Sequence, residues 1–224
     1  MHPPVELVIF DCDGVLVDTE RGAVRLNRQF FAERGHPLDD ATVIDMFIGK
    51  SAANGVARVT EFFGDPSVGE QWLARFREYN ASSLVEPVPG VVEAVKAMPY
   101  VRCVASSNLP RNIRHSLDCA GLLDLFDPYL FSATEVPRGK PFPDLFLHAA
   151  ATMGVEPAAC VVVEDSEAGV GAARAAGMHV FGFAGGVTPA ARLAGPGTTV
   201  FDDMRDLPGL VAAYDGQATT ITSA

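Results

Sequence analysis

Two aspartates lie directly after a short apolar run near the start of the chain. The run at 8–10 leads into Asp11, and Asp13 follows two residues later in the stretch VIFDCDGVLVDTE. A carboxylate buried at the end of a hydrophobic strand is costly, and like charges this close raise each other's pKa. Such a pair therefore needs a chemical role that offsets its cost.

Three further polar sets follow later apolar runs. The serine-rich stretch SSN (106–108) ends one run, Lys140 lies in RGKPFPD after the next, and Glu164 and Asp165 lie in EDS after a fourth. Each set alone is also explained by a turn, a helix cap or a solvated charge. Taken together, the four sets supply carboxylates, hydroxyl groups and an ammonium group after successive apolar runs, and we therefore predict that they form one shared site.

Short apolar runs recur along the chain, and most are followed by a helical pattern. The runs predict buried strands at 5–10, 101–106, 128–132, 160–164 and 179–183. The segments between them predict helices at about 91–98, 110–120, 143–153 and 167–176. This alternation predicts an α/β fold with a doubly wound, Rossmann-like parallel sheet. Ligands of such sheets bind at the carboxyl ends of the strands, where the four polar sets lie.

One long segment breaks this alternation, because it has helical spacing and no convincing strand. We predict an inserted all-helical cap at 19–85 within a core domain formed by 1–18 and 86–224. The stretch VEPVPG (85–90) is the return linker, which its two prolines stiffen. The glycine-rich stretch GVGAARAAG (169–177) lies within a predicted helix and indicates close packing of that helix on the sheet.

Composition excludes several classes of function. The 224 residues are 48% hydrophobic and carry a net charge of −11, which disfavours binding to nucleic acid. No apolar run is long enough to span a membrane, and the first residues do not resemble a signal peptide. The spacing of the four cysteines fits no zinc site, so we expect reduced thiols in a cytoplasmic protein.

The clustered carboxylates become favourable around a hard divalent cation, and Mg²⁺ prefers oxygen ligands. Asp11 and Asp165 are the predicted ligands, together with Glu164 and a backbone carbonyl near Asp13. The metal offsets the repulsion between the carboxylates.

The remaining polar groups suit a bound phosphate. The hydroxyl groups of Ser106 and Ser107 and the ammonium group of Lys140 are donors for phosphate oxygens. The whole set suits phosphoryl transfer, with Asp11 as nucleophile and Asp13 as general acid and base.

The motifs DCDGVLVD, SSN, GKPFPD and VVVEDS resemble, in this order, the four motifs of the haloacid dehalogenase superfamily. FDCDGVLVDTE and EDSEAGVGAARAAGM are most similar to its sugar-phosphatase and beta-phosphoglucomutase branch. The resemblance covers nearly the whole chain, including the inserted cap. It implies a nucleophile at Asp11, a general acid/base at Asp13, phosphate binders at Ser106 and Lys140, and Mg²⁺ ligands at Asp165 and, directly or through water, Glu164.

The predicted function is a Mg²⁺-dependent phosphatase. It would hydrolyse a small phosphorylated metabolite, a sugar or sugar-acid phosphate, through an aspartyl-phosphate intermediate. Asp13 favours phosphoryl chemistry, because the dehalogenases of the superfamily lack a second aspartate there. Substrate specificity is expected in the cap, where Lys50 is a candidate contact for a substrate carboxylate or hydroxyl.

Two alternatives remain at this point. The first is a beta-phosphoglucomutase-like phosphomutase, but such members usually carry a histidine on the first cap helix and an arginine in a cap loop. Residues 19–27 contain no histidine, and residues 47–55 contain Lys50 but no arginine. The second is a non-enzymatic phospho-receiver module, a class that is much shorter and lacks an inserted cap.

Overall fold

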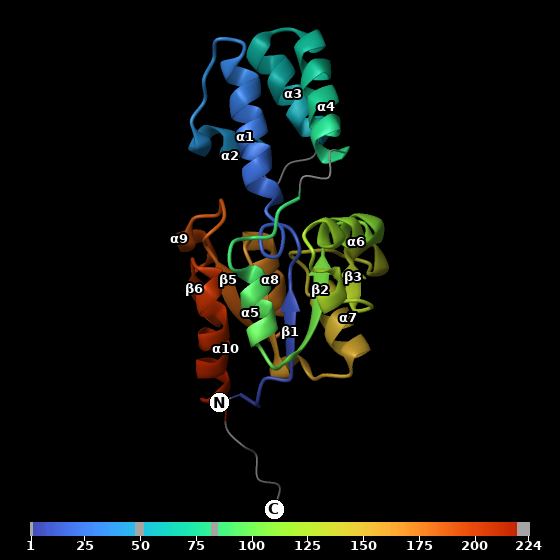
Figure 1. Cartoon of the computed structure of the whole chain (residues 1–224), viewed down its shortest axis with the longest axis vertical. Coiled ribbons are helices and arrows are strands. Elements are labelled where there is room, and N and C mark those ends of the chain that lie inside the picture. The colour runs from blue at the N-terminus through green and yellow to red at the C-terminus, as the bar shows by residue number, and fades with distance from the viewer. Residues whose placement is uncertain (1, 48–51, 82–84, 219–224) are drawn as a thin grey trace, which may run out of the picture. The chain divides into compact units, whose positions relative to one another are not determined.

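The computed structural model describes residues 2–47, 52–81 and 85–218 (Figure 1). The chain forms two compact units. The core unit consists of Met1–Asp18 and Glu86–Ala224, and the helical unit consists of Thr19–Val85.

The core unit is built on a six-stranded sheet in the order β3-β2-β1-β4-β5-β6. All adjacent strands are parallel. The strands are β1 (Leu7–Phe10), β2 (Val101–Ser106), β3 (Leu130–Ser132), β4 (Cys160–Glu164), β5 (His179–Phe183) and β6 (Thr198–Phe201). The chain moves outward from β1 to β2 and β3, and then returns to β4 on the other side of β1. The sheet therefore has its topological switch point between β1 and β4, where ligands of such folds bind.

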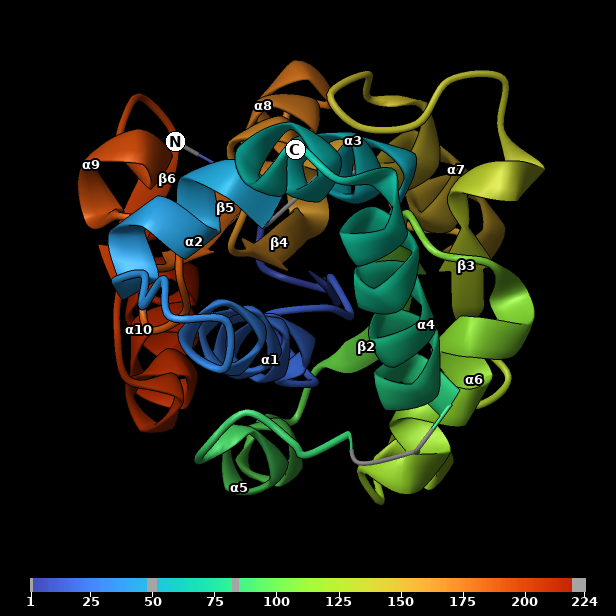
Figure 2. The ribbon, with the colours of Figure 1, turned by 90° about the horizontal axis from the view of Figure 1, so that it is seen from above.

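Helices cover both faces of this sheet. They are α5 (Val91–Ala97), α6 (Pro110–Cys119), α7 (Asp144–Met153), α8 (Glu167–Ala175), α9 (Ala190–Leu193) and α10 (Leu207–Asp215). Short 3₁₀ turns are η1 (Leu123–Leu125), η2 (Ala133–Glu135), η3 (Pro157–Ala159) and η4 (Met204–Asp206). Figure 2 shows α7 and α8 on the opposite face of the sheet from α5 and α10. Apolar side chains from β1, β2 and β4 pack with those of α7 and α8 into one buried cluster, whose burial stabilises the unit.

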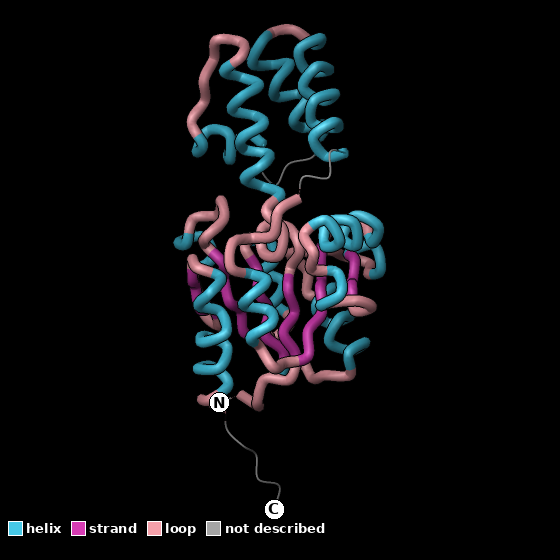
Figure 3. The backbone as a smooth tube through the Cα atoms, in the orientation of Figure 1, coloured by secondary structure: helices cyan, strands magenta, loops and turns pink. Residues whose placement is uncertain are grey.

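The described part of the helical unit contains helices and loops only (Figure 3). Its helices are α1 (Thr19–Ala32), α2 (Asp40–Phe47), α3 (Ala52–Phe63) and α4 (Pro66–Ala81). Aromatic side chains form its core. The ring of Phe31 packs against Phe47 and Phe63, and the buried Trp72 stacks on Phe47. The indole N–H of Trp72 donates to the side-chain oxygen of Asn27 at 2.8 Å, so this buried polar pair is satisfied.

The predicted fold class is confirmed, and the five predicted strands correspond to β1–β5. The structure adds strand β6 and helices α2, α9 and α10, which the sequence pattern does not predict. Half-buried threonines begin β6, so it lacks the continuous apolar pattern of the inner strands. The missed helices are short, between four and nine residues. No described helix has the length and apolar character needed to cross a membrane.

Candidate active site

The predicted site residues of the core unit gather at one edge of the sheet. Asp11 directly follows β1, Ser106 ends β2, and Glu164 ends β4 with Asp165 after it. Lys140 comes from the loop between β3 and α7. Because all strands are parallel, their carboxyl ends meet at this edge, next to the switch point.

Lys140 joins two of these carboxylates. Its Nζ lies 2.6 Å from Oδ1 of Asp11 and 2.6 Å from Oε1 of Glu164. The Lys140 side chain is 5% exposed and that of Glu164 is 0% exposed. The ring of Phe146 covers the ammonium group, with its centroid 5.0 Å away. The site therefore holds a desolvated cation between two carboxylates that belong to neighbouring strands.

Burial and charge shift the pKa of both partners. Burial raises the pKa of the Asp11 carboxyl to about 7, while Lys140 opposes this shift and the carboxylates of Glu164 and Asp13 add to it. Burial lowers the pKa of Lys140, but the carboxylates of Asp11 and Glu164 outweigh it, and the net shift is upward. Lys140 therefore stays protonated beside the two carboxylates.

The carboxylate cluster fits a divalent cation. One ligand oxygen each of Asp11, Glu164 and Asp165 lies within 4.8 Å of the others, and all three residues are buried. When ionised, they carry three negative charges against the one positive charge of Lys140, a formal sum of −2 that a divalent cation would neutralise. Oxygen donors of this kind are the ligands that Mg²⁺ prefers.

The chain holds Glu164 in place from two directions. Its Oε1 accepts from Lys140, and its Oε2 accepts from the backbone N–H of Ser166 at 2.8 Å and from the Ser166 hydroxyl at 3.0 Å. Ser166 is also the N-cap of α8, because its hydroxyl oxygen accepts from the backbone N–H of Gly169. The start of α8 thus fixes the carboxylate that orients Lys140.

Two glycines allow the backbone to approach the carboxylates closely. Gly14 has φ of +80°, and a Cβ there would lie 2.0 Å from Oδ2 of Asp165. A Cβ at Gly169 would lie 1.7 Å from Oε1 of Glu164. The sequence predicts that the glycine-rich stretch 169–177 packs closely on the sheet, but the contact of Gly169 with a site carboxylate is visible only in the structure.

Asn108 connects the second motif with the first. Its backbone N–H donates to the hydroxyl oxygen of Ser106 at 3.1 Å, and its side-chain amide makes a long contact of 3.5 Å to Oδ2 of Asp13. Its backbone carbonyl accepts from the hydroxyl of Ser132 at 2.7 Å. The stretch SSN puts Asn108 at the border of the predicted site, but its contacts with strands β2 and β3 and with the loop after β1 are visible only in the structure.

The roles of two further predicted residues stay predictions. Ser107 directly follows β2 at the same edge of the sheet and is exposed. Lys50 lies outside the described residues, so its predicted substrate contact stays a prediction. Three of the four cysteines, Cys12, Cys103 and Cys160, are buried, and all four are free thiols.

Taken together, the doubly wound parallel sheet and the lysine-bridged carboxylates at its switch point define an α/β enzyme. Residues 5–177 match the family of haloacid dehalogenase-like hydrolases. The chain belongs to this family, and the predicted superfamily and the predicted hydrolase class are confirmed.

Known proteins similar to this chain include named phosphatases. The 6-phosphogluconate phosphatase of Escherichia coli strain K12 is 32% identical over 210 residues, which cover 92% of this chain and 94% of that protein. Hexitol phosphatase B of the same strain is 34% identical over 190 residues, or 76% and 80% of the two chains. A crystal structure of a family hydrolase from Deinococcus radiodurans R1, with bound phosphate and sodium, superposes with a TM-score of 0.83 at 29% identity and covers 96% of this chain and 98% of that chain.

Proposed function

We propose that this chain is a Mg²⁺-dependent phosphatase that hydrolyses a phosphorylated sugar or sugar acid. The observation that carries the proposal is the buried ammonium group of Lys140 between Asp11 and Glu164, with Asp165 beside them. This arrangement offers a nucleophile, a cation for phosphate oxygens and a set of metal ligands at one strand edge. The names of the similar phosphatases support the substrate class.

The reaction has two steps in this proposal. A carboxylate oxygen of Asp11 attacks phosphorus, the bond between phosphorus and the leaving oxygen breaks, and Asp13 gives that oxygen a proton. Asp13 then takes a proton from water, the water oxygen attacks phosphorus, and the bond to Asp11 breaks to release phosphate. Lys140 and the Ser106 hydroxyl bind phosphoryl oxygens throughout.

Asp11 and Asp165, with Glu164 directly or through water, would hold Mg²⁺. The bound ion would supply positive charge to the phosphoryl oxygens. In the same proposal, the helical unit at 19–85 selects the part of the substrate that is not phosphate.

The function is tested by measuring phosphate release with Mg²⁺ from 6-phosphogluconate, a hexitol phosphate, phosphoglycolate and 4-nitrophenyl phosphate. We expect turnover of the aryl phosphate and faster turnover of at least one six-carbon substrate. A hexose 1-phosphate is the test for the mutase alternative, and we expect free sugar and phosphate rather than the 6-phosphate. Absence of turnover for every phosphate ester would refute a phosphatase.

The metal is tested on the same assay after exhaustive chelation. We expect activity to disappear, to return with Mg²⁺ and not to return with Ca²⁺, because the larger and looser shell of Ca²⁺ misplaces a nucleophile that is also a ligand. Elemental analysis confirms that the chelated protein is metal-free. Full activity of that metal-free protein would contradict the proposal.

A further inference from the structure

Lys140 lies in a tight turn of the loop between η2 and α7. The backbone N–H of Phe142 donates to the carbonyl of Gly139 at 3.0 Å, so Lys140 and Pro141 occupy the two central positions of the turn. On the side of α8, Cβ of Pro141 lies 3.9 Å from the position that a Cβ on Gly171 would take. The place of the ammonium group therefore depends on what holds this turn.

A second contact closes a wider ring around the same turn. Arg138 forms a two-pronged ion pair with Asp144, the first residue of α7, in which Nε lies 3.0 Å from Oδ2 and Nη2 lies 2.7 Å from Oδ1. The guanidinium group also lies over the ring of Phe142, 4.5 Å from its centroid. A two-pronged pair fixes the direction of both partners as well as their separation. Arg138 thus ties the residues before Lys140 to the residues after it.

Helix α7 is a firm anchor for this contact. Asp144 lies in its first turn, where the helix dipole favours a carboxylate, and the hydrogen bond from Arg138 is the main cause that lowers the pKa of this carboxyl. Leu145 and Phe146 of the same turn belong to the buried cluster under the sheet. The ring of Phe146 also covers the ammonium group of Lys140. One helix turn therefore holds both the backbone and the charged end of Lys140.

Stability alone does not account for the ion pair of Arg138. Its side chain is 56% exposed, and exposed ion pairs contribute little to the free energy of unfolding. The ammonium group of Lys140, in contrast, lies 2.6 Å from each of two carboxylates. A lysine side chain is flexible, so it keeps such a placement only when its backbone is fixed. The ion pair therefore has its main consequence at Lys140.

We propose that Arg138 is a positioning residue, which through its ion pair with Asp144 holds the turn that directs the Lys140 ammonium group to the phosphoryl oxygens. The inference deepens the proposed function and rests on it only for the role of Lys140 as a phosphate binder. The placement of Lys140 is a property that can be measured without phosphate and without turnover.

The placement is tested by brief acetylation of the full chain with acetic anhydride, followed by mass spectrometry. The chain contains three lysines, Lys50, Lys96 and Lys140. Lys140 is buried, whereas Lys96 is exposed and serves as the internal reference. Arg138→Ala should raise the acetylation rate of Lys140 relative to Lys96 about fivefold, the upper range for loss of an exposed ion pair. Arg138→Lys keeps the charge without the two-pronged geometry and should give an intermediate rate.

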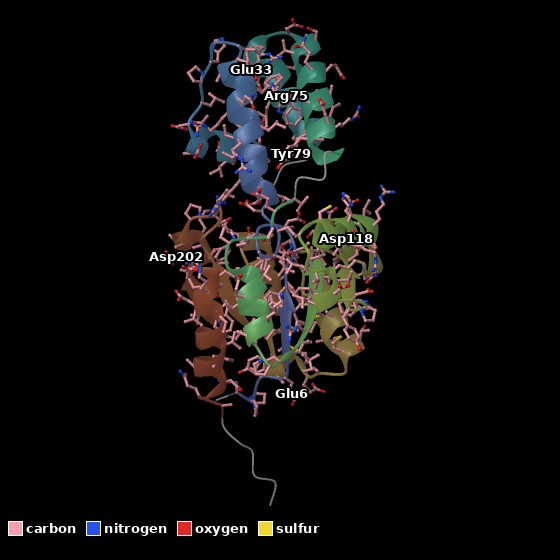
Figure 4. The ribbon with its side chains drawn as sticks, in the orientation of Figure 1. Glu6, Glu33, Arg75, Tyr79, Asp118 and Asp202 are labelled. Carbon is pink, nitrogen blue, oxygen red and sulfur yellow. The ribbon has the colours of Figure 1, made fainter. Side chains whose placement is uncertain are left out.

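The matched control is Arg114→Ala, which removes another exposed ion pair of the core unit. Arg114 pairs with Asp127 at 2.6 Å and lies one turn before Asp118, which Figure 4 labels on α6. This variant should leave the acetylation of Lys140 unchanged. Urea unfolding verifies that the Arg138 and Arg114 variants are folded and compares their stability. Equal acetylation of Lys140 in Arg138→Ala and Arg114→Ala would show that Arg138 does not position Lys140.

The link to phosphate is measured by calorimetry with inorganic phosphate and Mg²⁺. Arg138→Ala should weaken phosphate binding about fivefold, Arg138→Lys should weaken it less, and Arg114→Ala should leave it unchanged. The failures of the two proposals are distinguishable. Faster acetylation of Lys140 with unchanged phosphate affinity retains the positioning by Arg138 and removes Lys140 from the proposed phosphate site. A wild-type protein that binds no phosphate contradicts the proposed function, and the acetylation rates still decide the role of Arg138.

Discussion

The ion pairs of Lys140 are arranged for chemistry rather than for stability. Two charged carboxylates and an ammonium group are removed from water here, and such buried ion pairs add little net stability. The cluster also has a formal charge of −2 when Asp165 is included and all three carboxylates are ionised. A site with this cost is expected where a cation or a phosphate binds.

Replacing Asp11 by Asn tests the nucleophile. We expect turnover to fall at least about 10³-fold, equivalent to about 4 kcal/mol of activation free energy, because an amide does not form the covalent intermediate. Phosphate release measures the loss, and circular dichroism checks the fold. Asp118→Asn, on the exposed side of α6, is the control and should retain full activity. An Asp11→Asn rate within tenfold of wild type would exclude this role.

Replacing Asp13 by Asn tests the general acid and base. A sugar alkoxide leaves poorly unless it is protonated, whereas nitrophenolate leaves well without help. The variant should therefore slow formation of the phosphoenzyme more for a sugar phosphate than for 4-nitrophenyl phosphate. Phosphate on Asp11 should also persist longer, because water is no longer activated. Rapid quenching with mass spectrometry measures both effects. If the variant forms the phosphoenzyme equally slowly from both substrates and no phosphoenzyme accumulates, Asp13 is not the general acid and base and has a structural role only.

Sequence patterns could predict residues whose chemistry is local, but not those whose function depends on the fold. Asp11 and Asp165 were predictable because they directly follow apolar runs, and Lys140 because it lies between the next apolar run and a helix that begins near a proline. The sequence puts Asn108 at the border of the site through the SSN motif, but it does not predict the links of Asn108 to Ser106 and Ser132, because the link to Ser132 joins segments far apart in the sequence. The sequence neighbourhood of Asn108 is that of an ordinary helix cap.

The same distinction applies to whole strands and helices. Inner strands such as β1 and β4 are buried along their entire length, so their sequences are continuous apolar runs. The edge strand β6 buries only Phe201 fully and begins with threonines, so its sequence does not stand out. Helix α2 has only two buried residues, Val43 and Phe47, which is too few for a recognisable period.

Helix α8 allows a test of how an element positions a site. Gly169→Ala places a Cβ 1.7 Å from Oε1 of Glu164, so the helix or the carboxylate must move. We expect a loss of about 1–3 kcal/mol in the free energy of unfolding and reduced turnover, because Glu164 orients Lys140. Urea unfolding and phosphate release measure the two effects.

The control lies two residues further along the same helix. At Gly171 the nearest heavy atom to a new Cβ is Cβ of Pro141, 3.9 Å away, which is an ordinary contact. Gly171→Ala should therefore be neutral or raise stability by about 0.5–1 kcal/mol, the usual gain from replacing a helical glycine. Equal effects of the two substitutions would show that the helix start does not fix Glu164.

The helical unit is inserted into the core unit at a point where the chain nearly meets itself. The backbone N–H of Asp18 donates to the carbonyl of Glu86 at 2.8 Å, and that of Val88 donates to the carbonyl of Leu16 at 3.0 Å. Val17 and Pro87 form an antiparallel bridge between these bonds. The two connecting segments are thus paired like the strands of a hairpin, with residues 19–85 in the place of its turn.

This pairing predicts that the core unit folds without residues 19–85. A two-residue Asn-Gly turn is the natural replacement, because such turns join antiparallel strands that end on a hydrogen-bonded pair. The shortened chain keeps all six strands and the buried cluster between the sheet and helices α7 and α8. We expect a single cooperative unfolding transition and retained turnover of 4-nitrophenyl phosphate, but no preference for six-carbon substrates over phosphoglycolate.

The matched control carries Asp11→Asn in the same shortened chain and should fold equally well without activity. A shortened chain that lacks a cooperative transition would show that the two units depend on each other for folding, because every contact that defines the sheet is still present in it.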